Sequence, residues 1–387
     1  MKTKWAFLTI LAVFFVLAID SNAIAVNTRD IDNVLKKGVI DDQDKKIIDD
    51  FLSQGVQELV KTKDFTSIAQ LRTVILSRKS SQSQYAQQYS ESAYKQIQAG
   101  FEQAQTLRQE DRKTNVTISL LILIDGMEDL RLSDLAMAKL KDQNMVIRYW
   151  AVHSLTNPAI IEQLNSGATT NPQLARTIAG QLKEVVETSK AEIIVHIARF
   201  AANVNIPEGE ELLLQVADER IKRYADWTVK HEFYDNILLK LLESKIPISS
   251  QDPAAIIPTT SLNNTAIAQR FAQLYSYAIQ RYIKGKDTLN ETQKQQLASV
   301  LIEIEDKSIN RLMGGTQVTI RTIRRAIERG DAMEILLDEH DKLLGSETTA
   351  GQLPSKLGFD YSTTPDGPKR TAPIPLPEKT QKPVTNN

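Results

Sequence analysis

Residues 142–164, DQNMVIRYWAVHSLTNPAIIEQL, have the pattern of two helices separated by a break. The stretch opens with a polar turn, continues as an amphipathic segment and is interrupted at Asn157 and Pro158. One apolar stripe at helical spacing consists of Val146, Trp150, Ala151 and Leu155. The small side chain of Ala151 would let a neighbouring helix approach closely. These features predict an amphipathic helix, a break and a second, shorter helix.

The same stretch resembles a known repeat. Inner-helix positions of HEAT-type repeats match the spacing of Val146, Arg148, Ala151 and Leu155. A weaker echo follows 28 residues later at Leu174, Arg176 and Ala179, which is closer than the ~40 residues of a regular HEAT unit. The resemblance covers about residues 116–205. It implies an all-α fold, a degenerate HEAT-like helical-hairpin solenoid, and it implies a scaffold without specifying any chemistry.

The first 25 residues have the pattern of an export signal. Lys2 and Lys4 precede a 15-residue, mostly apolar run, and Ala23-Ile24-Ala25 fits a signal-peptidase site. The run is shorter than the ~20 residues of a membrane-spanning helix. We therefore expect cleavage after Ala25 and a periplasmic or secreted bacterial protein, with no stable membrane insertion after cleavage. An uncleaved signal anchor is the alternative.

Composition narrows the classes of function. The chain contains no cysteine, which excludes disulfides, thiolate metal sites and a cysteine nucleophile. Its net charge of −1 argues against general affinity for nucleic acid or anionic membranes. It also lacks a glycine-rich phosphate loop, a dinucleotide-binding fingerprint and a G-x-S-x-G motif, so we expect no cofactor.

Turn residues and composition divide the rest of the chain. Residues 26–245 are predicted to form a helical repeat block, in which Gly126 interrupts one helix and residues 208–223 and 226–244 form a hairpin. Residues 246–261 contain three prolines and no helical period, which indicates a linker or long loop. A C-terminal helical block is expected over 262–345, with a hairpin broken at Gly330. From 346 to 387 the chain collects prolines and loses its apolar period, so we expect a disordered tail.

An aromatic stripe is the first candidate binding surface. Steps of four residues separate Tyr85, Tyr89, Ala93, Ile97 and Phe101 in an otherwise polar, glutamine-rich segment. Such a stripe is either a narrow packing seam between helices or a docking stripe in which Tyr85, Tyr89 and Phe101 contact a partner.

A cluster of arginines is the second candidate. One side of a predicted helix carries Arg321, Arg324, Arg325 and Arg329, and the next helix is rich in acids. The ordinary interpretation is a hairpin with complementary charges. The alternative is an anion-binding patch for an acidic polysaccharide or a phosphorylated partner.

Two patterns invite a catalytic interpretation. Acidic residues gather around Gly126 at Asp125, Glu128, Asp129 and Asp134, as a glycoside hydrolase would need, although helix ends commonly carry acids. His231, Glu232 and Asp235 resemble a zinc-protease motif, but aspartate replaces its last histidine. A third protein ligand would have to come from His153, His196 or His340, none of which lies in a motif.

Taken together, the residues favour an exported, non-catalytic scaffold or adaptor that binds another macromolecule through an extended helical surface. The expected partner is another envelope or extracellular protein, with acidic polysaccharide as an alternative and nucleic acid excluded. The rival hypothesis is an exported hydrolase that acts on a polymer through the acids around Asp125.

Overall fold

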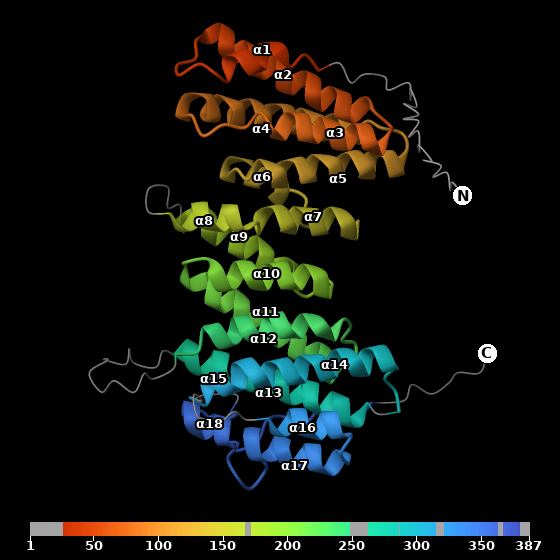
Figure 1. Ribbon diagram of the computed structural model, residues 1–387, viewed down its shortest axis with the longest axis vertical. Helices are drawn as coiled ribbons and strands as arrows, with labels where there is room; N and C mark the ends of the chain where they lie inside the picture. The colour runs from red at the N-terminus through yellow and green to blue at the C-terminus, as the bar shows by residue number, and fades with distance from the viewer. Residues whose placement is uncertain are drawn as a thin grey trace, which may run out of the picture. The chain divides into compact units, whose positions relative to one another are not determined.

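The computed structural model describes residues 26–166, 172–247, 262–285, 287–314, 321–362 and 367–379. These residues form helices joined by turns and contain no β-strand; a lone bridge joins Gly345 and Ala350. The predicted all-α class is therefore confirmed for this part of the chain (Figure 1). The predicted export signal at 1–25 lies outside the described residues. Within the described ranges, no helix is both long and apolar enough to cross a bilayer.

The chain divides into two compact units, Met1–Ser119 and Leu120–Asn387. The helices of the first unit are α1 (Arg29–Val34), α2 (Asp42–Lys61), α3 (Phe65–Leu76), α4 (Ser83–Gln105) and the beginning of α5 (Glu110–Met127). Helix α2 packs against α1, α3 and α4. It begins with a capping box, in which the side chains of Asp41 and Asp44 each accept the other's backbone N–H.

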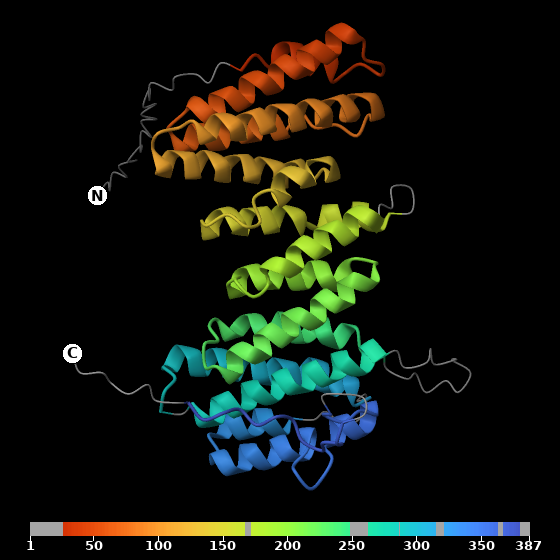
Figure 2. The ribbon, with the colours of Figure 1, turned by 180° about the vertical axis from the view of Figure 1, so that it is seen from behind.

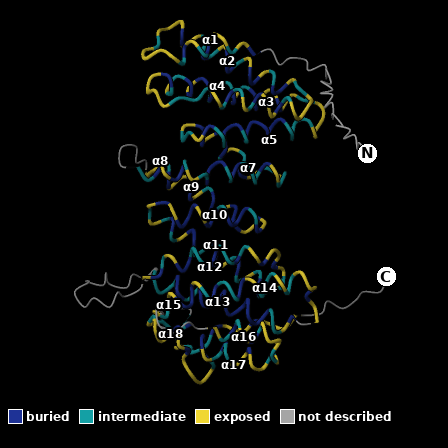
Figure 3. Tube along the Cα trace, in the orientation of Figure 1, coloured by how far each residue is buried: buried dark blue, intermediate teal, exposed yellow. Residues whose placement is uncertain are grey.

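The second unit continues with a run of helices and short turns. They are η1 (Leu130–Leu132), α6 (Ser133–Met137), α7 (Met145–Leu155), α8 (Pro158–Asn165), α9 (Pro172–Val185), α10 (Ala191–Asn203), α11 (Pro207–Ala225), η2 (Glu232–Tyr234) and α12 (Asp235–Ser244). Helix α10 packs against α7 on one side and against α11 and α12 on the other. Buried residues follow the contacting faces of these helices (Figure 3).

The stretch at 142–164 folds as two helices separated by a break, as predicted, and α7 packs on α6 and α10 while α8 packs on η1, α9 and α10. Asn144 caps α7 by accepting the N–H of Val146 at 2.9 Å, and Asn157 caps α8, whose first residue is Pro158. The buried stripe, however, is shifted by one residue from the prediction at its N-terminal end. Val146 is 49% exposed, whereas Ile147 is buried. Ile147 lies four residues before Ala151, so the two side chains share one face of the helix. Ala151 is fully buried, as expected.

Two predicted helix boundaries in this unit are wrong. Helix α5 runs through Gly126 and ends after Met127, where Glu128 takes a left-handed φ of 54°. The helix predicted over 226–244 forms only from Asp235, because Trp227 and His231 also take left-handed φ values, 55° and 54°. Neither residue type reveals such a conformation in advance, since a positive φ is uncommon for any residue other than glycine.

The remaining helices belong to the same unit. They are α13 (Leu262–Lys284), α14 (Glu291–Ile304), the π-helical turn η3 (Glu305–Ile309), α15 (Asn310–Leu312), α16 (Thr322–Arg329), α17 (Met333–Leu344) and α18 (Gln352–Leu357). Helix α13 packs against α11 and α12 as well as α14 and α17. The helices on both sides of the predicted linker thus share one unit, and the unit boundary lies at 119/120. Residues 248–261 of that linker lie outside the described residues.

Helices α16 and α17 form the predicted hairpin, and the break between them lies at the predicted residue. Gly330 takes a left-handed φ of 64° after α16, which only a residue without a Cβ adopts at little cost. Gly345, with φ 112°, ends α17 at the expected position. The helix breaks at Gly330 and Gly345 therefore lie where the sequence predicts them, although a further short helix, α18, follows in the same unit.

The expectation of a disordered tail is wrong for residues 346–362 and 367–379. Helix α18 and the chain after it are packed within the second unit, with Leu353, Tyr361 and Leu376 at most 5% exposed. The tail has no helical period because most of it is not helical, and an extended chain buries apolar residues one by one in grooves between helices. Figure 2 shows this segment crossing the back of the second unit. Residues 363–366 and 380–387 lie outside the described residues.

Candidate ligand-binding cleft

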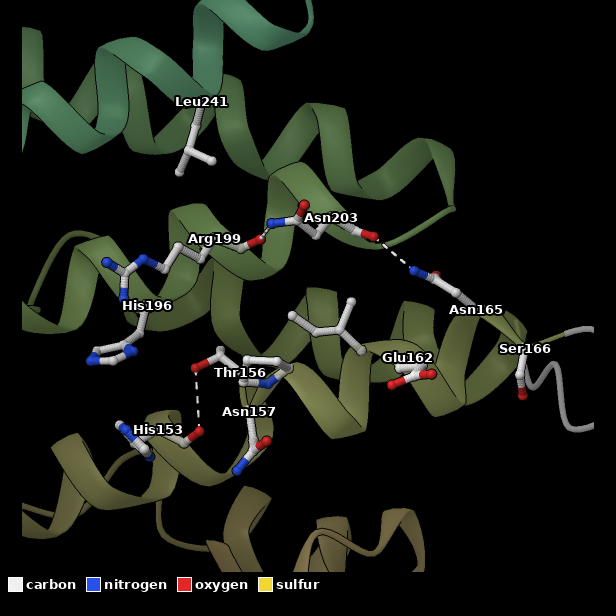
Figure 4. Close-up of a pocket in the computed structure, with 12 residues that line it drawn as sticks. His153, Thr156, Asn157, Glu162, Asn165, Ser166, His196, Arg199, Asn203 and Leu241 are labelled. Carbon is white, nitrogen blue, oxygen red and sulfur yellow. Dashed lines mark hydrogen bonds between the residues drawn. The ribbon is translucent and has the colours of Figure 1, made fainter.

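A cleft of about 930 Å³ opens in the second unit between the consecutive helices α7 and α8 and helix α10. Its walls are formed by His153, Thr156, Asn157, Pro158, Ile161, Glu162, Asn165, Ser166, His196, Arg199, Asn203 and Leu241. This volume is in the range of ligand-binding sites, which bring a few polar groups together on an apolar lining. In Figure 4, His153, His196 and Arg199 gather at one end of the cleft, and Glu162, Asn165 and Ser166 lie at the other.

Asparagine side chains hold the walls of the cleft in place. The Asn157 carboxamide caps α8 and also donates to Asp125 Oδ1 at 3.1 Å. Asn165, the last residue of α8, donates to the carbonyl of Asn203 and accepts the N–H of Asn205, at 2.8 Å each. The two bonds of Asn165 thus tie α8 to the end of α10 at one end of the cleft.

A pair of imidazoles forms the first end of the cleft. His153 Nδ1 lies 2.9 Å from Asp125 Oδ1, and the rings of His153 and His196 meet edge to face with centroids 4.8 Å apart. Tyr149 packs edge to face on His196 with a centroid distance of 5.5 Å. Burial, together with the positive fields of His153 and Arg199, lowers the pKa of His196 to about 4. His196 is consequently neutral at pH 7.

Two charged side chains in the cleft form no ion pair with any described residue: Arg199 on α10 and Glu162 on α8. Both are exposed. A guanidinium at one end, a carboxylate at the other and the apolar side chains of Ile161 and Leu241 in the lining would suit a ligand with both polar and apolar parts.

The sequence did not single out this cleft. The sequence indicated His153 and His196 only as possible additional ligands of a metal site. It did not indicate Arg199 or Glu162. The one available signal was that His153 lies just before the predicted break, which begins at Asn157. The contact between α7 and α10 that creates the cleft joins residues more than 40 positions apart, and no local pattern encodes it.

The aromatic stripe of α4 is a packing seam. Tyr85, Tyr89 and Phe101 are 1%, 3% and 7% exposed. Both hydroxyls bond backbone carbonyls, Tyr85 to Arg78 at 3.0 Å and Tyr89 to Ile75 at 2.7 Å. Side chains buried in this way are not available to a partner, so the docking interpretation of the stripe is wrong.

The arginine cluster is divided between paired and exposed side chains. Arg324 donates to Asp306 and to Glu328, at 2.7 Å each, and Arg321 lies 3.8 Å from Asp306. Arg325 and Arg329 are exposed. The acidic partners come from η3 and from α16 itself, and no described acid of α17 pairs with this cluster. The predicted charge complementarity is present, but with a different element.

The acids around Gly126 do not converge. Asp125 turns toward His153, whereas Asp129 caps η1 and pairs with Arg131 at 3.1 Å. Glu128 and Asp134 are exposed. Asp125 and Asp129 are thus each engaged by a basic side chain, and the glycoside hydrolase interpretation of this cluster stays a prediction.

The protease-like motif is part of a buried ionic network. Asp235, 1% exposed, accepts two bonds from Arg220 and one from the hydroxyl of Tyr224. Glu232, equally buried, pairs with Arg281 at 2.9 Å. Both acids are engaged by arginines, and the described residues contain no cluster of three or more histidines and acids that could hold a metal ion.

Comparison with known proteins places no relative beside this chain: no family model, no curated protein and no solved structure matches it.

Proposed function

We propose that this chain is an exported, HEAT-like helical adaptor that binds an extended segment of another envelope or extracellular protein in the cleft between α7–α8 and α10. The observation that carries the proposal is the cleft itself, which has opposite charges without an ion-pair partner among the described residues at its two ends, and apolar side chains in its lining. A polypeptide offers the matching groups, because its backbone and side chains supply donors, acceptors, charges and apolar surface within a few residues.

The repeat pattern supports the same interpretation. Helices α7 and α10 pack side by side, and helical-repeat proteins commonly present their binding surface along such stacked helices. Export rests on the signal-like pattern of residues 1–25. An intact mass equal to that of a chain beginning at Val26 would support export. A mass that includes residues 1–25 would count against it.

Reversal of one charge in the cleft tests the proposal. Arg199→Glu replaces the cation of the cleft without removing buried surface, so the fold should be retained and partner capture reduced by about tenfold or more. The matched control is Arg329→Glu, which reverses an exposed arginine on α16. Capture from a native envelope extract, quantified by mass spectrometry, would show the same proteins with wild type and control and their loss with Arg199→Glu. Equal capture by all three chains would refute a binding role for the cleft.

One observation favours a second candidate function, hydrolysis of an envelope polymer. The bond between Asp125 and His153 orients an imidazole toward the cleft, as a general base requires. On this alternative, purified protein would cleave envelope glycan or peptide, and His153→Gln would abolish cleavage. Absence of new reducing ends or amines with wild-type protein would leave the adaptor as the better account.

A further inference from the structure

The end of the described chain is docked in a groove that recognises its backbone. Residues 372–379, here called the strap, run extended along α13 in the same direction as that helix. Their sequence, APIPLPEK, alternates proline with Ile374 and Leu376. Prolines 373, 375 and 377 have no N–H, so Ile374 and Leu376 supply the only backbone donors between them.

Side chains of α13 bind both of these donors. The Gln273 carboxamide accepts the N–H of Ile374 at 2.7 Å and donates to its carbonyl at 3.0 Å. Seven residues further on, Gln280 accepts the N–H of Leu376 at 2.7 Å. Both glutamines are less than 10% exposed. The strap is thus recognised through its backbone at every second residue.

The far end of the groove binds carbonyls and one apolar side chain. Lys284 donates to the carbonyl of Leu376 and to Glu378, at 2.6 Å each, and Trp227 Nε1 donates to the carbonyl of Pro377 at 2.8 Å. Leu376 itself is 1% exposed. An aromatic N–H beside glutamine and lysine donors, with a pocket for one apolar side chain, has the chemistry of a site for polyproline II peptides.

We propose that this groove is a binding site for proline-rich segments of the form Pro-apolar-Pro-apolar-Pro on a partner protein, and that the strap is its intramolecular occupant. Most of the hydrogen bonds go to strap backbone, which any segment with alternating prolines presents in the same way. Such a segment arrives already extended and loses little conformational entropy on docking. The groove lies on α13 and is separate from the cleft, so the inference does not depend on the proposed function.

The tethered strap makes the groove regulated. A ligand on the same chain competes at an effective concentration in the millimolar range. A partner segment consequently binds measurably only when its local concentration is high or when the strap is weakened. While the strap is bound, its own Leu376 fills the pocket. A partner segment can enter the pocket only after the strap has left.

The test uses the full chain and a fluorescent peptide with the sequence of residues 370–379. In the chain, Leu376→Asp should release the strap, because it places a charge in the buried pocket. The peptide is expected to bind this variant on the order of 100-fold more tightly than wild type. Adding Gln273→Ala should weaken peptide binding about tenfold, since both hydrogen bonds to Ile374 are lost. The matched control, Gln295→Ala on the exposed face of α14, should have no effect.

A second readout does not depend on the stability of the Leu376→Asp chain. Because the chain has no cysteine, Lys379→Cys gives a single labelling site, and a fluorophore there should report displacement when excess peptide is added to the otherwise wild-type chain. A peptide with aspartate at the Leu376 position should displace nothing.

Two results would overturn the inference. If the folded Leu376→Asp chain fails to bind the peptide and the labelled chain shows no displacement, the strap is only a structural staple. If wild type instead forms a dimer with exchanged straps that the peptide does not dissociate, the occupant is a second copy and not a partner segment.

Discussion

At the scale of residues, the register of α7 shows how one position decides burial. Val146 and Ile147 are neighbours of similar size, yet only Ile147 lies on the face that contains Ala151 and Leu155. Ile147→Ala should therefore lower the free energy of unfolding by about 2 to 5 kcal/mol, because a cavity remains where the side chain was. Val146→Ala should change it by less than about 0.5 kcal/mol. Urea denaturation of the two variants makes the comparison, and equal losses would contradict the register.

His196 predicts a dependence of stability on pH. Its pKa is lowered in the folded protein to about 4, below the unfolded value of 6.5. Between pH 4 and 6.5 His196 is protonated in the unfolded chain but not in the folded chain. The free energy of unfolding therefore falls as the pH drops from about 6.5 to 4. His196→Gln removes this contribution and should flatten the profile. Melting temperatures at intervals of pH provide the check, with parallel wild-type and variant curves as the contrary result.

Residue chemistry also marks what the sequence could and could not predict. The capping asparagines and Pro158 begin helices, and the glycines at 330 and 345 end them, through local backbone effects, so those boundaries were predictable. The left-handed conformations of Trp227 and His231 were not, because these residue types rarely adopt them.

At the scale of elements, the junction between α11 and α12 depends on a buried ion pair. Arg220 and Asp235 have side chains 3% and 1% exposed and lie 2.5 Å apart. Asp235→Asn leaves a buried guanidinium without its counter-charge, so we expect a loss of about 3 kcal/mol or more in unfolding free energy. Glu187→Gln breaks the exposed pair with Lys222 and should leave the melting temperature unchanged. Similar melting temperatures for the two variants would contradict the buried network.

The cleft illustrates why elements are easier to predict than sites. Each of α7, α8 and α10 has a readable amphipathic pattern, and all three were expected as helices. The site arises where α10 returns beside α7, which brings His196 to His153 and Arg199 across from Glu162. That juxtaposition depends on packing between distant segments. The conspicuous local patterns, the tyrosine stripe and the arginine cluster, therefore pointed to candidate surfaces on other helices.

At the scale of the whole molecule, the C-terminal segment stabilises the second unit. Leu353, Tyr361 and Leu376 are buried, and Tyr361 donates to the carbonyl of Leu344 at 2.8 Å. Deletion of residues 346–387 should therefore lower the unfolding free energy by roughly 3 kcal/mol or more, since each large buried side chain contributes about 1.5 to 3 kcal/mol. Thermal melting followed by circular dichroism provides the measurement. A truncated chain that melts with wild type would contradict the packed tail.

The central claim is that the cleft between α7–α8 and α10 binds another protein. Its most direct test is a photo-crosslinking amino acid in place of Glu162, inside the cleft, compared with the same residue in place of Glu187, an exposed position outside the cleft lining. After irradiation of intact cells, the account predicts discrete adducts at position 162 that disappear when Arg199→Glu is added, and none of these at 187. The same adducts at both positions would contradict the account, and so would the absence of adducts at position 162.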